Sequence, residues 1–348
     1  MDILHNPYRG VGLNVDALAD IPFPSTNAKA PLALLARCPH AAETPLADAP
    51  ALATTCGVAS VTLKDERTRM GLGSFKALGA AYVIARDAAE GRAQGQTYVT
   101  ASAGNHGLSV TAGAAAFGAK AVIYIAETVP ESFAERLRAM GADVVRSGAD
   151  YEASMEAAMA AAEAQGAVLL SDSSWAGYTD RPYRVMEGYL ALMDEVFAQI
   201  DRAPTHLFLQ AGVGGLAGAA AASARAVWGD RTRMIVVEPE AAPALIASIK
   251  AGAPVETTGP VSAMGRLDCK VPSYIALKGL ARDADDFVTL SEDEGEMGAA
   301  KAAEAGFATT PSGGAGLSAL LGSAPHRAAL GLDGQSRVLC ILSEGPEG

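Results

Sequence analysis

Short apolar runs rich in β-branched residues alternate along this chain with alanine-rich segments, and glycines gather in the turns that follow those runs. A short apolar run bounded by glycine is typical of a buried strand, whereas a spacer rich in Ala, Leu and Met is typical of a helix. Repeated strand–helix–strand units predict parallel sheets with helices on both faces. Because 348 residues are too many for one small domain, we expect two αβα lobes with mainly parallel sheets.

The expected strands form two series. The first series comprises residues 98–101, 121–125, 143–146 and 168–170. The second comprises residues 206–210, 234–238, 287–290 and 338–342. A strand at 60–64, followed by a helix at 74–88, has no obvious partner nearby, so we place it in the second sheet. The prediction is therefore a large domain from residues 1–97 and 176–348, with a small α/β domain, residues 98–175, inserted into it.

One helix start is marked by residue type. Thr128, followed by Pro130 and Glu131, resembles a capping box, and Phe133, Leu137 and Met140 then share one face. We expect a helix to begin there, with the Thr128 hydroxyl as its cap.

Composition excludes several classes of protein. The 39 acidic residues outnumber the 27 basic ones, which argues against a nucleic-acid partner. No apolar run is long enough to span a membrane, and Asp2, His5 and Arg9 interrupt any secretory signal. The four cysteines lie far apart, so neither a disulfide framework nor a metal cluster is indicated. We expect a cytoplasmic protein without a metal site.

The first candidate loop ends in a lysine. Lys76 follows Gly71-Leu72-Gly73-Ser74-Phe75 and opens an apolar helix. Its ammonium could simply reach water from the helix surface. Alternatively, desolvation and the helix dipole favour a neutral amine, the form that attacks an aldehyde.

Two further loops also join a strand to a helix. Ser102-Ala103-Gly104-Asn105-His106 offers backbone N–H groups to an anion such as a carboxylate, although an ordinary serine-capped turn would look alike. A histidine at such a helix start more often caps or packs than acts as a base. Gly212-Val213-Gly214-Gly215-Leu216 suits a bound phosphate. It lacks the dinucleotide fingerprint, although Glu238 at the end of the next strand leaves that reading weakly open. Together the three loops favour a pyridoxal phosphate enzyme that acts on amino acids.

A family resemblance joins these loops to other stretches of the chain. The residues that carry it are Lys64-Asp65-Glu66, Gly73-Ser74-Phe75-Lys76, Ser102-Ala103-Gly104-Asn105-His106-Gly107, Asp172 with Trp175 and Gly177-Tyr178-Thr179, Gly188-Tyr189, Gly212-Val213-Gly214-Gly215 and Glu344-Gly345. The sequence resembles the fold-type II pyridoxal phosphate enzymes of the threonine dehydratase and tryptophan synthase beta superfamily. Within them it is most similar to diaminopropionate ammonia-lyase.

The resemblance implies a role for each matching position. Lys76 would be the Schiff-base lysine and Asp172 the base for an L-amino acid. The remaining assignments are Asn105 facing the cofactor O3′, Gly212, Val213, Gly214, Gly215 and Leu216 holding its phosphate, Ser343 beside its pyridine nitrogen, and Ser102, Ala103, Gly104, Asn105 and His106 receiving the substrate carboxylate. A neutral hydroxyl at Ser343 would favour loss of a β leaving group over transamination.

One position departs from the ammonia-lyase pattern. Ala103 stands where those enzymes carry an aspartate that serves the D-isomer. Since a methyl group cannot accept a proton, we predict no activity on D-diaminopropionate. Cys269 matches a cysteine of the family, without an evident second one.

The expected activity is α,β-elimination from L-2,3-diaminopropionate, giving pyruvate and ammonia. The alternatives are a serine, threonine or 3-hydroxyaspartate dehydratase on the same fold, and more remotely an amino-acid sensor without catalysis. The resemblance also implies that the protein is a homodimer and that its substrate is a small amino acid.

Overall fold

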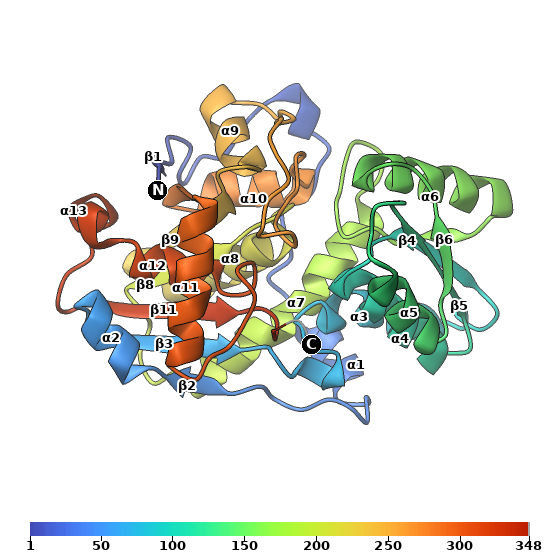
Figure 1. Ribbon diagram of the computed structural model, residues 1–348, viewed down its shortest axis with the longest axis horizontal. Helices are drawn as coiled ribbons and strands as arrows, with labels where there is room; N and C mark the ends of the chain where they lie inside the picture. Colours follow the sequence, from blue (N-terminus) through green and yellow to red (C-terminus); the bar gives the residue numbers. More distant parts are fainter. Residues whose placement is uncertain (347–348) are drawn as a thin grey trace.

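Two sheets organise the protein, and the computed structural model describes residues 1–346 (Figure 1). The smaller sheet has the strand order β6-β5-β4-β7, and every neighbouring pair is parallel. Its strands are β4 (Thr97–Ala101), β5 (Lys120–Ile125), β6 (Asp143–Arg146) and β7 (Val168–Leu169). All four were expected from their apolar runs.

The larger sheet has seven strands in the order β1-β10-β9-β8-β11-β3-β2. Its strands are β1 (Ile3–His5), β2 (Leu46–Asp48), β3 (Ser60–Asp65), β8 (His206–Gln210), β9 (Arg233–Pro239), β10 (Asp286–Leu290) and β11 (Arg337–Leu342). β3 pairs in parallel with β11, which confirms that the early strand belongs to the second sheet. The antiparallel edge strands β1 and β2 were not expected, because three residues are too few for a readable pattern.

The core of the large lobe has two sides. Leu207 and Leu209 of β8 belong to one apolar cluster, whereas Phe208 between them belongs to another. Successive side chains of a strand point to opposite faces, so both faces of this sheet are covered. The first cluster includes α7 (Asp180–Gln199), α8 (Gly215–Trp228) and α10 (Tyr274–Asp283), and the second includes α2 (Pro50–Cys56) and α12 (Ala315–Leu321).

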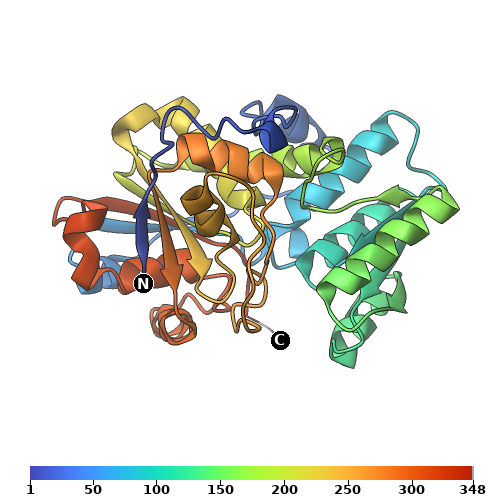
Figure 2. The same ribbon diagram turned by 90° about the horizontal axis from the view of Figure 1, so that it is seen from above.

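The remaining helices surround both sheets. They are α1 (Lys29–Leu35), α3 (Ala77–Ala89), α4 (Asn105–Ala116), α5 (Glu131–Ala139), α6 (Tyr151–Gln165), α9 (Ala244–Ala251), α11 (Glu292–Glu304) and α13 (Arg327–Leu330), with 3₁₀ turns at Asp16–Leu18, Arg69–Gly71, Gly229–Arg231 and Ala324–His326. The N-terminal segment packs against α10 (Figure 2), where Lys278 donates hydrogen bonds to the carbonyls of Leu18 and Ile21, each at 2.6 Å.

The predicted cap at Thr128 is wrong. α5 begins at Glu131 with Pro130 as its N-cap residue, so Thr128 stands too far before the first turn to reach its N–H groups. The Thr128 hydroxyl instead donates to the Ala149 carbonyl at 3.3 Å. A reciprocal capping box is present at α11, where Ser291 and Glu294 cap one another's backbone.

Candidate active site

The three candidate loops come together between the two lobes. Asp172, just after β7, pairs with Lys76, and its carbonyl oxygen lies 3.9 Å from the position that a Cβ on Gly215 would occupy. The Arg266 Nε would lie 3.4 Å from a Cβ on Gly104, and the Arg266 carbonyl 3.2 Å from one on Gly212. The loops at the carboxyl ends of both sheets therefore form one site, as is usual in open α/β folds.

Lys76 immediately precedes α3, and its Nζ donates to the Asp172 carboxylate. Burial favours the neutral amine, but the neighbouring Asp172 carboxylate outweighs burial and raises the pKa of Lys76. The pKa of Asp172 is likewise lowered by Lys76 in spite of burial. The prediction of a neutral amine is thus wrong where Lys76 faces Asp172, because the carboxylate comes from a loop 96 positions away and no local pattern includes it.

Asp172 is held by a short, ordered turn. The rings of Trp175 and Tyr178 stack with centroids 4.4 Å apart, and the Tyr178 hydroxyl donates to the Leu169 carbonyl at 2.9 Å. The same hydroxyl oxygen accepts the Ser171 N–H at 3.1 Å. These bonds tie the turn after Asp172 to the backbone just before it. The Asp172 side chain is 15% exposed and points at Lys76 rather than capping a helix.

The predicted carboxylate loop lies at the start of α4. The Gly104 N–H donates to the Ser102 hydroxyl at 3.3 Å, and Ala103 adds only a methyl group. Asn105 begins the helix and donates its amide to the Glu344 carboxylate. Within residues 1–346 no side chain caps this helix, which leaves its first N–H groups available to an anion.

His106 is a packing residue. It is 4% exposed, and its Nε2 lies 2.8 Å from the Leu170 carbonyl. Burial lowers its pKa and so favours the neutral ring.

The glycine loop before α8 has the geometry of an anion site. Gly214 has φ +96°, a conformation that favours glycine, and a Cβ there would lie 3.0 Å from the Ala276 Cβ. Gly215 and Leu216 open a 14-residue helix without a side-chain cap, which leaves N–H donors for a phosphate. Gly212 and Val213 complete the turn, with the Cys269 Sγ 3.0 Å from a Cβ placed on Gly212.

Glu238 does not support a dinucleotide site. Both of its carboxylate oxygens accept backbone N–H groups of α9, from Leu245 at 2.7 Å and Ile246 at 2.8 Å. The side chain is 1% exposed, and burial raises its pKa to about 8. It is a buried helix cap, unavailable to a ribose.

Ser343 follows β11 and ties this strand to the lysine loop. Its carbonyl accepts the Phe75 N–H at 3.1 Å, and its own N–H donates to the Gly313 carbonyl at 3.0 Å. Ser343 is 5% exposed. Through its bond to Phe75 it contacts the lysine loop, and in the sequence it directly precedes Glu344.

Three residues of this region received no role from the sequence. Glu344 accepts from Asn105 and from the Thr310 hydroxyl. Arg266 lies over the Phe133 ring at 5.7 Å from its centroid and 3.6 Å from Glu344. Tyr189 reaches the site from α7. Glu344 and Tyr189 stand in motifs that carry the family resemblance, but only the fold brings these side chains and Arg266 to the loops.

The residues fit a pyridoxal phosphate molecule: an amine at Lys76, backbone donors at Gly212–Leu216, and a glycine-lined turn with no room for larger side chains. Among residues 1–346, no group of three His, Cys, Asp or Glu side chains could hold a metal ion. Over the same residues, no helix is long and apolar enough to cross a membrane.

Comparison with known proteins finds relatives that agree with a pyridoxal phosphate site. The model of the family described as "Pyridoxal-phosphate dependent enzyme" matches residues 38–344. A diaminopropionate ammonia-lyase of Salmonella typhimurium is 31% identical over 289 residues, which are 75% of this chain and 72% of the relative. A probable D-serine dehydratase of Rhizobium leguminosarum is 29% identical over 224 residues, 58% of this chain and 50% of that protein.

Solved structures of such enzymes are similar to this chain over almost its whole length. The Escherichia coli diaminopropionate ammonia-lyase, in complex with an aminoacrylate-PLP azomethine reaction intermediate, superposes with a TM-score of 0.88 at 27% identity. That match covers 99% of this chain and 93% of the other. Threonine deaminase isoform 2 of Solanum lycopersicum, at 21% identity and a TM-score of 0.81 over 99% of this chain and 94% of the other, shares the fold.

Proposed function

This chain belongs to the pyridoxal-phosphate dependent enzymes, and from that membership we propose that it eliminates the β-amine of L-2,3-diaminopropionate to give pyruvate and ammonia. Its cofactor is pyridoxal 5′-phosphate. The observation that carries the proposal is the ion pair of Lys76 and Asp172 beside the glycine loop.

The cofactor is held by this chain's own groups. Lys76 would bind its aldehyde, and the backbone from Gly212 to Leu216 would bind its phosphate. Asn105 would serve its O3′, and Ser343 would serve its ring nitrogen. When bound, pyridoxal phosphate supplies an electron-accepting ring, which stabilises the electron pair left on the substrate α-carbon after the α-proton is removed.

Asp172 and the helix α4 act on the substrate. The N–H groups of the Ser102–His106 loop hold its carboxylate. An Asp172 oxygen accepts the α-proton of the L-isomer, a transfer worth about 10²–10⁴-fold in rate when the base is well placed. The same carboxylate attracts the substrate's β-ammonium, which serine and threonine lack. Ala103 offers no second base, so the D-isomer is not a substrate.

A second candidate is a dehydratase for hydroxy amino acids, including 3-hydroxyaspartate. Ala103 favours it, as does the similarity to probable D-serine dehydratases. The Arg266 guanidinium beside Gly104 also favours it, because a guanidinium there suits a substrate with a second carboxylate. By analogy with the family we further propose a cytoplasmic homodimer.

The test is an amino-acid panel given to the purified, cofactor-loaded protein, with keto acid and ammonia measured together. L-2,3-Diaminopropionate should yield two ammonia molecules for each pyruvate, whereas serine would yield one. The D-isomer should yield neither product. If hydroxy amino acids give keto acid and L-diaminopropionate does not, the dehydratase is correct and the ammonia-lyase is not.

A further inference from the structure

Tyr189 of α7 buries a hydroxyl that the reaction outlined above does not use. The residue is 2% exposed, and its hydroxyl oxygen has no hydrogen-bond partner within residues 1–346. A buried hydroxyl without a partner costs free energy, so such groups need an explanation in the structure. Packing alone would be served equally well by phenylalanine.

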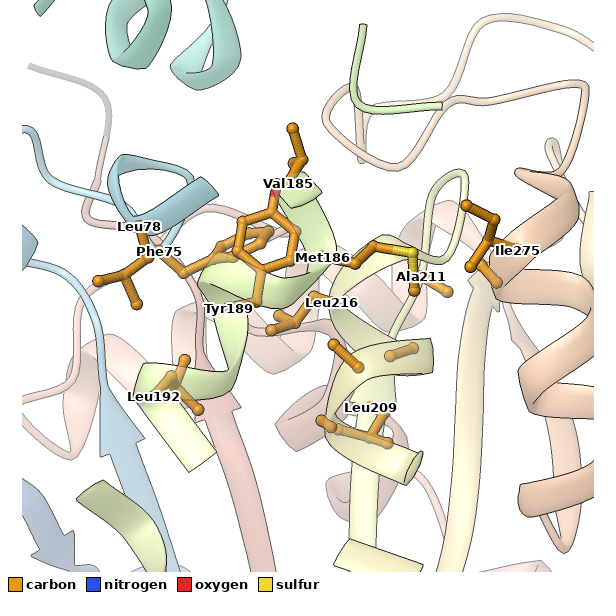
Figure 3. Packing of buried hydrophobic residues seen from close by; sticks show 14 of the residues in the cluster. Phe75, Leu78, Val185, Met186, Tyr189, Leu192, Leu209, Ala211, Leu216 and Ile275 are labelled. Atoms are coloured by element: carbon orange, nitrogen blue, oxygen red, sulfur yellow. The ribbon is translucent and has the colours of Figure 1, made fainter. Parts of the chain in front are cut away.

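The Tyr189 ring is wedged between the helix of the lysine loop and the helix of the glycine loop. A Cβ on Gly79 of α3 would lie 2.6 Å from the ring, and a Cβ on Gly215 of α8 would lie 3.6 Å from it. The ring meets Phe75 edge to face, with centroids 4.9 Å apart, and lies between Phe75 and Met186 (Figure 3). Two glycines thus make room for this one side chain.

The hydroxyl interacts electrostatically with both members of the charged pair of the site. Burial raises the pKa of Tyr189, while the Lys76 ammonium opposes this shift and the Asp172 carboxylate adds to it. Other titratable groups that interact with Lys76 or Asp172 are the Cys269 thiol, beside Gly212, the His106 ring, and the hydroxyls of Tyr151 and Tyr178. Of these, His106 donates its Nε2–H to the Leu170 carbonyl, which leaves the Nδ1 of the neutral ring as an acceptor that cannot donate to an amine. Burial raises the pKa of the Cys269 thiol to about 12.

The neutral Lys76 amine carries a lone pair, which needs a hydrogen-bond donor. An ionised carboxylate only accepts hydrogen bonds, so Asp172 can bind an N–H of Lys76 but not its lone pair. A tyrosine hydroxyl can both donate and accept. We propose that Tyr189 is a positioning residue for Lys76 that donates its hydroxyl hydrogen to the lone pair of the neutral amine, whereas the ammonium is bound by Asp172. This inference rests on the proposed role of Lys76.

The test follows the reactivity of Lys76 rather than turnover. In cofactor-free protein, acetylation of Lys76 is measured by mass spectrometry over a range of pH for the parent and for Tyr189→Phe. Loss of the donor should disfavour the neutral amine, shift the profile to higher pH and slow labelling roughly five-fold at a fixed pH. The rate at which Lys76 captures added pyridoxal phosphate should fall in parallel.

The matched control is Tyr82→Phe. Tyr82 donates to Glu187 at 2.7 Å, between the same two helices, α3 and α7, but away from Lys76. In the Tyr82→Phe variant, the pH profile of Lys76 acetylation should equal that of the parent. If Tyr189→Phe and Tyr82→Phe give the same profile, the inference is overturned.

Should Tyr189→Phe fail to fold, 4-aminophenylalanine and 4-methylphenylalanine at position 189 replace it, because they match in size and only the first can donate. The amino variant should keep the parent profile and the methyl variant should not; identical profiles would overturn the inference. An unchanged profile in a protein that still makes keto acid rejects this inference alone. A shifted profile in a protein that consumes no amino acid rejects the proposed function alone.

Discussion

At the scale of single residues, the chemistry depends on a lysine and a carboxylate that face each other. Lys76 and Asp172 stand 96 positions apart and meet as an ion pair. The pairing raises the pKa of Lys76 and lowers the pKa of Asp172 against the effect of burial, so each group favours its charged form while the two face each other.

Replacing the base tests this arrangement. Asp172→Asn should lower kcat for L-diaminopropionate by about 10²–10⁴-fold, because an amide cannot accept the α-proton. Cofactor binding through Lys76 should persist. Steady-state kinetics together with the absorbance of bound cofactor would measure both.

Asp180→Asn serves as the control, since the Asp180 side chain is 80% exposed at the start of α7. It should leave kcat unchanged. An Asp172→Asn variant with the turnover of the parent would remove Asp172 from the reaction.

Residue patterns indicate which loops matter better than they indicate charge states. That Lys76 and the two glycine loops stand at helix starts was predictable because glycine next to a helix start has a local physical meaning; their roles toward the cofactor and substrate stay predictions. The raised pKa of Lys76, the Asn105–Glu344 contact and the buried Tyr189 hydroxyl depend on groups distant in sequence. No local pattern contains that information.

At the scale of elements, the strands are the part of the fold that the sequence indicates best. Buried parallel strands read as continuous apolar runs, and β4, β5, β6 and β8 lie where those runs occur. Helix starts are less predictable, as Thr128 demonstrates, because a cap depends on the backbone angle of the next residues. The domain bounds at residues 97 and 176 stay a prediction.

The helix α8 and its glycine turn give a prediction at this scale. Gly214→Ala should raise the dissociation constant for pyridoxal phosphate about ten-fold, because a side chain at positive φ costs roughly 1–2 kcal/mol. Contact with Ala276 and Leu245 adds to that cost. Equilibrium titration of cofactor-free protein would measure the change.

Gly166→Ala is the matched control. Gly166 also has positive φ, +61°, but ends α6 with nothing within 4 Å of an added Cβ. Gly166→Ala should lower the free energy of unfolding and leave the dissociation constant for pyridoxal phosphate unchanged. Equal affinities in both variants and the parent would argue against a phosphate at Gly214.

At the scale of the whole molecule, a buried ionic network joins the large sheet to the site. Glu195 of α7 accepts from Lys64 of β3 at 2.6 Å and from Arg69 at 2.7 Å, and Arg69 also binds Glu66. Lys64, Glu66 and Arg69 are fully buried. Met70, directly after Arg69, has φ +51°, so the network holds a strained turn six residues before Lys76.

Glu195→Gln should lower the free energy of unfolding by about 3–5 kcal/mol near neutral pH, because it leaves buried cations without their carboxylate. Burial opposes ionisation of Glu195, but Arg69 and Lys64 outweigh burial and lower its pKa. Its contribution is therefore present above the unfolded pKa of 4.5 and is lost as pH falls through the folded value. Denaturant titrations at several pH values should show the parent and variant converging in acid.

Glu90→Gln provides the comparison, because Glu90 pairs with Arg86 and Arg92 on the surface. It should change stability little at any pH. A gap between parent and Glu195→Gln that did not narrow in acid would contradict the assigned role of this carboxylate.

The most direct test of the account is to locate the bound cofactor on the chain. Borohydride reduction of the loaded protein, followed by peptide mass spectrometry, should find the reduced cofactor on Lys76 and on no other lysine. Finding it on a different lysine, in protein that still converts an amino acid to keto acid, would contradict the account.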